Sequence, residues 1–167
     1  YILSPATTAL NRLPAPENGQ AAFTVRLASQ PGEAIRVTLV LAGGAVAGTT
    51  LSTSTLDFTT GNWSSPQSVT ITVPDDGDST FETYKVDLSA TGWNGAAPIA
   101  LTGAYLGVAP GSVFVRNIDD DIPGITLTQI IPSGAATVDG TSVVTEGSTG
   151  DRYQVRLNTA PGVGNYV

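Results

Sequence analysis

Short apolar runs with a period of two, each closed by a turn signal, constrain the fold of this sequence most. Phe23, Val25 and Leu27 alternate with other residues, and the pattern recurs at residues 37–41, 69–73 and 84–88. Such alternation places apolar residues on one face of a β-strand, whereas no segment keeps a helical i, i+3, i+4, i+7 pattern for three turns. Turn signals such as Gln30-Pro31-Gly32 separate the runs. The sequence therefore predicts an all-β fold, an antiparallel, Greek-key-like β-sandwich of about seven strands.

Part of this pattern occurs twice along the chain. Glu17 to Gly32 reads ENGQAAFTVRLASQPG, and Glu146 to Gly162 reads EGSTGDRYQVRLNTAPG. Ile122-Pro123-Gly124 lies between the two copies and has the composition of a short, stiff linker, because Pro fixes φ and Gly permits a turn. We therefore expect a sandwich over residues 1–121, a linker over 122–124 and the start of a second, incomplete β-repeat over 125–167, as in a tandem array.

Composition excludes several classes of function. The chain has no His and no Cys, which excludes Ser-His-Asp and Cys-His catalysis, disulfides and the usual zinc sites. Seven Lys and Arg stand against fourteen Asp and Glu, for a net charge of −7, so we expect no nucleic-acid partner. No stretch approaches the roughly 20 apolar residues of a membrane span, so we expect no membrane insertion. Only 13% of the residues are charged, and such a polar surface is typical of secreted proteins, so we expect an extracellular or cell-surface location.

Eight of the fourteen acidic residues fall where predicted strands begin or end. They are Glu17, Asp75, Asp76, Asp78, Glu82, Asp119, Asp120 and Asp121. If successive strands run antiparallel, all eight lie at one pole of the sandwich, where carboxylates repel one another unless a cation neutralises them. Ca²⁺ takes about six to eight oxygen ligands and suits such a cluster better than Mg²⁺. The sequence therefore predicts a Ca²⁺ site at this pole, with a solvated acidic end as the alternative.

Four motifs, in this order, resemble the Calx-beta domain family. The first is the turn at residues 16–19 before AAFTVRL, and the second is the Phe-x-x-Gly-x-Trp turn within LDFTTGNWSSPQSVTITVPDD. The third is FETYKVDLSA, and the fourth is the closing Ile-Asp-Asp-Asp at residues 118–121. The GNW variant is similar to versions found in large bacterial surface and adhesin proteins. The resemblance covers roughly residues 13–121 and implies a β-sandwich with calcium ligands at one pole. By this resemblance the ligands are Glu17, Asp75, Asp76, Glu82, Asp119, Asp120 and Asp121, and Asp78 falls in the same loop.

Three functions from different classes compete. We favour a non-enzymatic structural or adhesive module of a tandem-repeat surface protein, in which Ca²⁺ stiffens the junction with the neighbouring repeat. The alternative is a subunit of an extracellular filament, in which the incomplete repeat completes the sandwich of an identical chain by β-strand addition. An enzyme, such as a glycosidase that acts through paired carboxylates, is the third, but no acidic pair stands beside aromatic sugar platforms. The expected partners are thus neighbouring repeats of the same protein or identical chains.

One segment has no clean period. Residues 91–110 contain Trp93 and Tyr105. Either this segment is a long loop that packs on its own domain, where the two aromatic side chains cover an edge or an end, or it is a binding loop.

Overall fold

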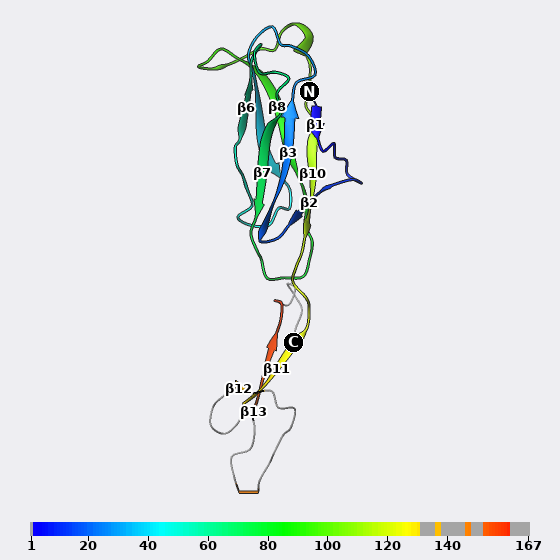
Figure 1. The fold of residues 1–167 in the computed structure, drawn as a ribbon, viewed down its shortest axis with the longest axis vertical. Coiled ribbons are helices and arrows are strands. Elements are labelled where there is room, and N and C mark those ends of the chain that lie inside the picture. Colours follow the sequence, from blue (N-terminus) through cyan, green and yellow to red (C-terminus); the bar gives the residue numbers. More distant parts are fainter. Residues whose placement is uncertain (1, 131–135, 138–145, 148–151, 161–167) are drawn as a thin grey trace. The chain divides into compact units, whose positions relative to one another are not determined.

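The computed structural model describes residues 2–130, 136–137, 146–147 and 152–160 (Figure 1). The chain forms two compact units. The first comprises residues 1–76 and 80–120, and the second comprises residues 77–79 and 121–167. No helix among the described residues is long and apolar enough to cross a membrane.

Two β-sheets form the first unit (Figure 1). The smaller sheet has the order β1-β3-β7-β5, with bounds Ile2–Ser4, Gly19–Arg26, Gln67–Val73 and Thr50–Leu51. The larger has the order β2-β10-β8-β4-β6, with bounds Leu13–Pro16, Ser112–Ile118, Thr83–Trp93, Ile35–Ala42 and Thr55–Phe58. The short strand β9, Pro98–Ile99, pairs with β8.

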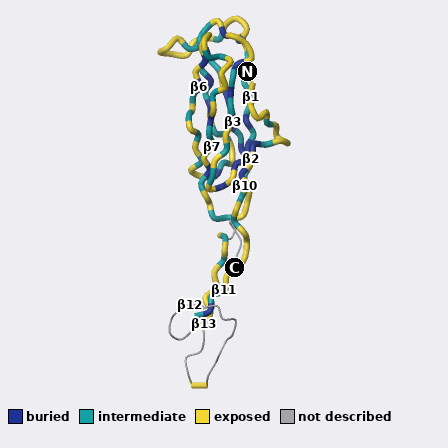
Figure 2. Tube along the Cα trace, in the orientation of Figure 1, coloured by how far each residue is buried: buried dark blue, intermediate teal, exposed yellow. Residues whose placement is uncertain are grey.

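The core of the first unit consists of the alternating apolar residues. Phe23 and Val25 of β3 face the core from the smaller sheet, and Val37 and Val86 face it from β4 and β8; each is at most 1% exposed. Figure 2 shows buried positions alternating mostly with positions of intermediate burial along these strands. Because period two distinguishes the two faces of a strand, the core-facing residues could be read from the sequence.

The prediction of an all-β, sandwich-like fold is confirmed. Seven strands of the first unit have four or more residues, namely β2, β3, β4, β6, β7, β8 and β10. One pairing departs from the antiparallel expectation, because β2 runs parallel to β10, with Leu13 opposite Val115 and Pro16 opposite Ile118. Alternation determines which way side chains face but not which strand is the neighbour, so this pairing had no signal in the sequence.

The segment after β8 packs on its own unit. Strand β8 continues to Trp93, and β9 extends the sheet beside it. Tyr105 is 5% exposed and joins the core, and its hydroxyl donates a hydrogen bond to the backbone oxygen of Ser29. The amide of Thr102 donates to Glu33 Oε1 at 2.6 Å. Of the two predicted alternatives for residues 91–110, these contacts favour the packed loop.

Strands β11, Ile125–Ile130, β12, Ala136–Thr137, and β13, Arg152–Leu157, form the described sheet of the second unit, in the order β12-β11-β13. Both pairings are antiparallel. Strand β13 contains the residues that repeat the sequence of β3, so the same sequence pattern forms a strand in both units. The last two residues of the sequence repeat, 161 and 162, lie outside the described residues.

Candidate cation site

Glu17 lies in the turn that joins β2 to β3. The next residue, Asn18, has φ of +49°, a left-handed conformation that Asn adopts more readily than most residues. A Cβ atom on Gly19 would lie 2.8 Å from Pro16 Cγ, so the turn needs glycine there. The Glu17 amide donates a hydrogen bond to the Ile118 carbonyl at 3.0 Å, which fixes the turn against the end of β10. As a result the Glu17 side chain points inward and is only 4% exposed.

Other acidic residues reach this turn from three further strand ends. Asp75 and Asp76 follow β7, Glu82 directly precedes β8, and Asp119 and Asp120 follow β10. Strand pairing explains why these ends meet, because Gly19 of β3 is opposite Val73 of β7. On the larger sheet, Arg116 of β10 is opposite Thr83 of β8. Ends of both sheets therefore carry carboxylates to one pole of the first unit.

Glu17 is the shared member of the close carboxylate groups. Its carboxylate lies with those of Asp76 and Glu82, and also with those of Asp75 and Asp120, in groups whose oxygen atoms are within 4.8 Å of one another. An oxygen of Asp119 is also within 4.8 Å of Glu17. The structure thus brings six of the eight predicted residues together in the first unit. The other two, Asp78 and Asp121, belong to the second unit.

The surroundings of Glu17 disfavour the ionised form of its carboxylate. Both of its carboxylate oxygens are buried and accept no hydrogen bond from any residue that the structure describes. Burial, followed by the negative charges of Asp76, Asp119, Glu82 and Asp120, raises the pKa of Glu17 to about 7. A bound cation would reverse this effect, because it favours the charged form of every carboxylate around it. The donor set is carboxylate oxygen throughout, which fits a hard cation such as Ca²⁺.

Asn117 belongs to the same cluster and was absent from the sequence prediction. Its side chain is fully buried, and Nδ2 donates to Glu82 Oε2 at 3.1 Å while the backbone amide donates to the Glu82 carbonyl at 2.9 Å. Asn117 therefore orients Glu82, and its own Oδ1 is buried with no hydrogen-bond partner in the described part of the chain. The signal was present in the alternation of β10, because Val113, Val115 and Asn117 occupy successive core-facing positions.

No family model and no curated protein matches the chain. Among solved structures, the chain is similar to WR4, a C. elegans MSP family member, with a TM-score of 0.35 and 11% sequence identity, over 71% of this chain and 95% of that one. A likeness this distant carries no argument about function.

Proposed function

We propose that the first unit binds Ca²⁺ at the cluster around Glu17 and serves as a non-enzymatic structural or adhesive module of an extracellular tandem-repeat protein. The observation that carries this proposal is the Glu17 carboxylate, which is 4% exposed and whose oxygens have no hydrogen-bond partner among the described residues. An ionised carboxylate buried without a partner is strongly unfavourable, and proteins pair such groups or use them to coordinate metals. A cation ligated by Glu17 removes this penalty.

The site would hold the cation with side chains from four chain segments. Glu17 comes from the β2–β3 turn, Asp75 and Asp76 from the end of β7, Glu82 from the start of β8, and Asp119 and Asp120 from the end of β10. Because β7 belongs to the smaller sheet and β2, β8 and β10 to the larger, a single ion would cross-link the two sheets. The site would bind the ion without catalysing a reaction, and the bound ion would stiffen this pole of the first unit.

A structural role also agrees with the order of residues along the chain. Asp119 and Asp120 come directly before Asp121 and the Ile122-Pro123-Gly124 segment. Ligation of Asp119 and Asp120 would fix the backbone at the point where it leaves β10. In an array of repeats, a backbone fixed at this point limits bending between one repeat and the next. This restraint supports a stiffening role for the ion.

Thermal unfolding in millimolar Ca²⁺, in chelator and in Mg²⁺ tests this proposal. A ligand that binds only the folded state at a hundredfold excess over Kd contributes about 2.7 kcal/mol, which raises Tm by several degrees for a domain of this size. We expect this rise with Ca²⁺, a smaller one with Mg²⁺, and none in Glu17→Gln. The matched control is Glu146→Gln, at an exposed position of the second unit, which should keep the full rise. An unchanged Tm in the native sequence, or an equal rise in Glu17→Gln, would reject the Ca²⁺ site.

The filament function remains a second candidate because of one apolar face in the second unit. Leu127 and Val155 are opposite each other on β11 and β13, and they are 62% and 63% exposed. In the repeated sequence Val155 corresponds to Val25, which is fully buried in the first unit. A position that is buried in the core of the first unit is thus exposed at its counterpart, Val155, in the described part of the second unit.

Self-association measurements test the second candidate. If identical chains cover this face, sedimentation velocity should show species that grow with protein concentration, and electron micrographs should show fibres. The double substitution Leu127→Ser and Val155→Ser should abolish both, while Thr126→Ser, a control on the same strand, should not. A chain that stays monomeric at every concentration would eliminate the filament.

A further inference from the structure

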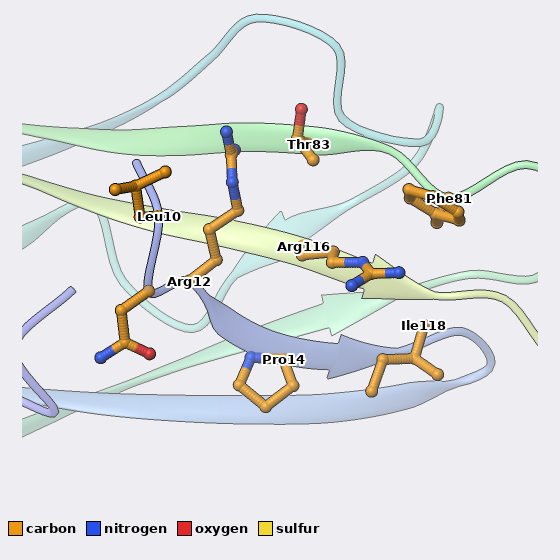
Figure 3. A pocket seen from close by; sticks show the side chains of 8 residues that line it. Leu10, Arg12, Pro14, Phe81, Thr83, Arg116 and Ile118 are labelled. Carbon is orange, nitrogen blue, oxygen red and sulfur yellow. The ribbon is translucent and has the colours of Figure 1, made fainter. Parts of the chain in front are cut away.

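A groove on the outer surface of the larger sheet carries an inference independent of the cation site. The groove has a volume of about 640 Å³ and lies over β2, β10 and the start of β8 (Figure 3). Pro14, Thr83 and Arg116 share this surface because Arg116 is opposite Pro14 on one side and opposite Thr83 on the other. Glu17 and Asn117 face the core, whereas these three residues face outward near the same strand ends.

Large apolar groups are exposed in the groove. Leu10 is 100% exposed, Phe81 58% and Ile118 50%, and Pro14 contributes a fourth apolar side chain. Single exposed apolar residues are ordinary, but apolar side chains gathered in a depression rimmed by polar groups are typical of binding surfaces. The groove therefore offers contact area to an apolar side chain of a ligand.

Two guanidinium groups give the groove a positive charge in an acidic chain. Arg12 and Arg116 are two of only seven basic residues in a chain of net charge −7. Neither forms an ion pair with any described residue, and none of the described residues that line the groove is acidic. Two other cations of this sheet, Arg36 and Lys85, are by contrast already paired with Asp57 and Asp87.

The two arginines are held in place by contacts that leave donors available. Arg116 lies over the Phe81 ring with its Cζ 4.2 Å from the ring centroid, and Figure 3 shows its guanidinium beside that ring. Arg12 donates from Nε to the Ala9 carbonyl at 3.0 Å, and Figure 3 shows it reaching across the groove toward Thr83. Stacking and a backbone bond of this kind fix the direction of a guanidinium, whose remaining N–H groups match a carboxylate.

We propose that this groove binds an extended peptide segment of a partner protein in which an Asp or Glu side chain neighbours a large aliphatic one. The carboxylate pairs with Arg116 or Arg12, and the aliphatic side chain contacts Leu10, Pro14 and Ile118. A long polyanion fits less well, because Glu82 and Asp119 lie directly beside the groove residues in sequence and repel it. A sugar fits less well too, because one face of Phe81, the groove's aromatic ring, is covered by Arg116.

An array of capped hexapeptides tests this proposal. One central position carries Asp, Glu, Asn, Gln or Lys, and its neighbour carries Ala, Val, Leu or Ile. The full chain should bind Asp-Leu and Glu-Ile types about tenfold more tightly than their amide counterparts, because only the acids form a charge-assisted bidentate pair. Arg116→Gln should lose this tenfold preference. Arg26→Gln, which removes the same charge from β3 of the other sheet, should retain it.

Each other outcome overturns the proposal. Equal binding of acidic and amide peptides, an equal loss in Arg26→Gln, or no binding to any peptide would show that the groove does not select a carboxylate. Self-association that Arg116→Gln abolishes would assign the groove to a second copy of the chain. Preferential retention on polyglutamate or on a polyuronate would assign it to a polyanion. Thermal unfolding of Arg116→Gln, which should match the native chain, establishes that the variant is folded.

Discussion

At the scale of single residues, the candidate cation site arises where polar groups occupy core-facing positions. Leu13, Ala15 and Glu17 follow the alternation of β2 into the turn, and all three are less than 10% exposed. On the neighbouring strand, Asn117 takes the position after Val113 and Val115. The alternation that builds the core therefore continues at its end with a carboxylate and an amide. The alternation in the sequence places both Glu17 and Asn117 at core-facing positions, whereas a search for acidic residues identifies only Glu17.

The raised pKa of Glu17 makes the stability of the first unit depend on pH in the absence of a cation. Its pKa is about 7 in the folded chain, against 4.5 as the ordinary value, so the folded state binds the proton more tightly. The stabilising contribution is complete below about pH 4.5 and is lost as pH rises through 7, with an upper magnitude of about 3 kcal/mol. Urea unfolding in chelator at pH 5 and pH 8 should show this loss in the native chain.

Glu17→Gln isolates this contribution from those of the other acids. The amide does not titrate, so the variant should lose less stability between pH 5 and pH 8 than the native chain, and the difference belongs to Glu17. Equal losses in both proteins would contradict the buried, charged environment described for this side chain. Glu146→Gln should behave as the native chain does, because its position is exposed.

At the scale of elements, the sequence predicted which face of each strand is buried better than it predicted which strands pair with one another. Alternation indicated which residues of β3, β4, β7 and β8 face the core, and the strand order placed acidic residues at strand ends. The alternation carried no information about the parallel β2–β10 pairing, which depends on contacts between residues about one hundred positions apart. The groove was missed for the same reason, since its residues come from three separate segments and meet only through strand pairing.

Gly92 determines whether β9 can join the larger sheet. Its backbone lies between Ile35 on β4 and Ile99 on β9, and a Cβ atom there would lie 2.7 Å from Ile99 Cγ1 and 3.0 Å from the Ala100 oxygen. Gly92→Ala should therefore displace β9 and destabilise the first unit by about 1–3 kcal/mol. Hydrogen exchange should show faster exchange around Ile99 with the centre of β8 unchanged.

Ser89→Ala provides the matched control for this substitution. Ser89 lies on the same strand and is exposed, so it should alter neither stability nor exchange around Ile99. If Gly92→Ala left both unchanged as well, the close approach of β9 to β8 would not exist in solution.

At the scale of the whole molecule, the candidate site is a property of the sandwich and not of any one strand. Its side chains come from both sheets of the first unit, so a bound ion should restrain β7 together with β2, β8 and β10. We expect Ca²⁺ to slow hydrogen exchange at the ends of these strands near Glu17, and to leave the opposite end unchanged, where the Leu27 amide donates to the Trp63 carbonyl. Uniform slowing over the unit, or slowing at one strand alone, would contradict cross-linking of the sheets.

The parallel pairing of β2 and β10 determines how the first unit would respond to mechanical tension. The chain enters β2 opposite Val115, midway along β10, and leaves β10 at the pole where β2 also ends; four residue pairs, from Leu13–Val115 to Pro16–Ile118, join the two strands. A pulling force applied at residues 12 and 119 would therefore act along both strands in opposite directions. All four pairs would bear the load at once in shear, instead of separating one after another as in a peeled hairpin, and an ion at Glu17 would reinforce the same junction.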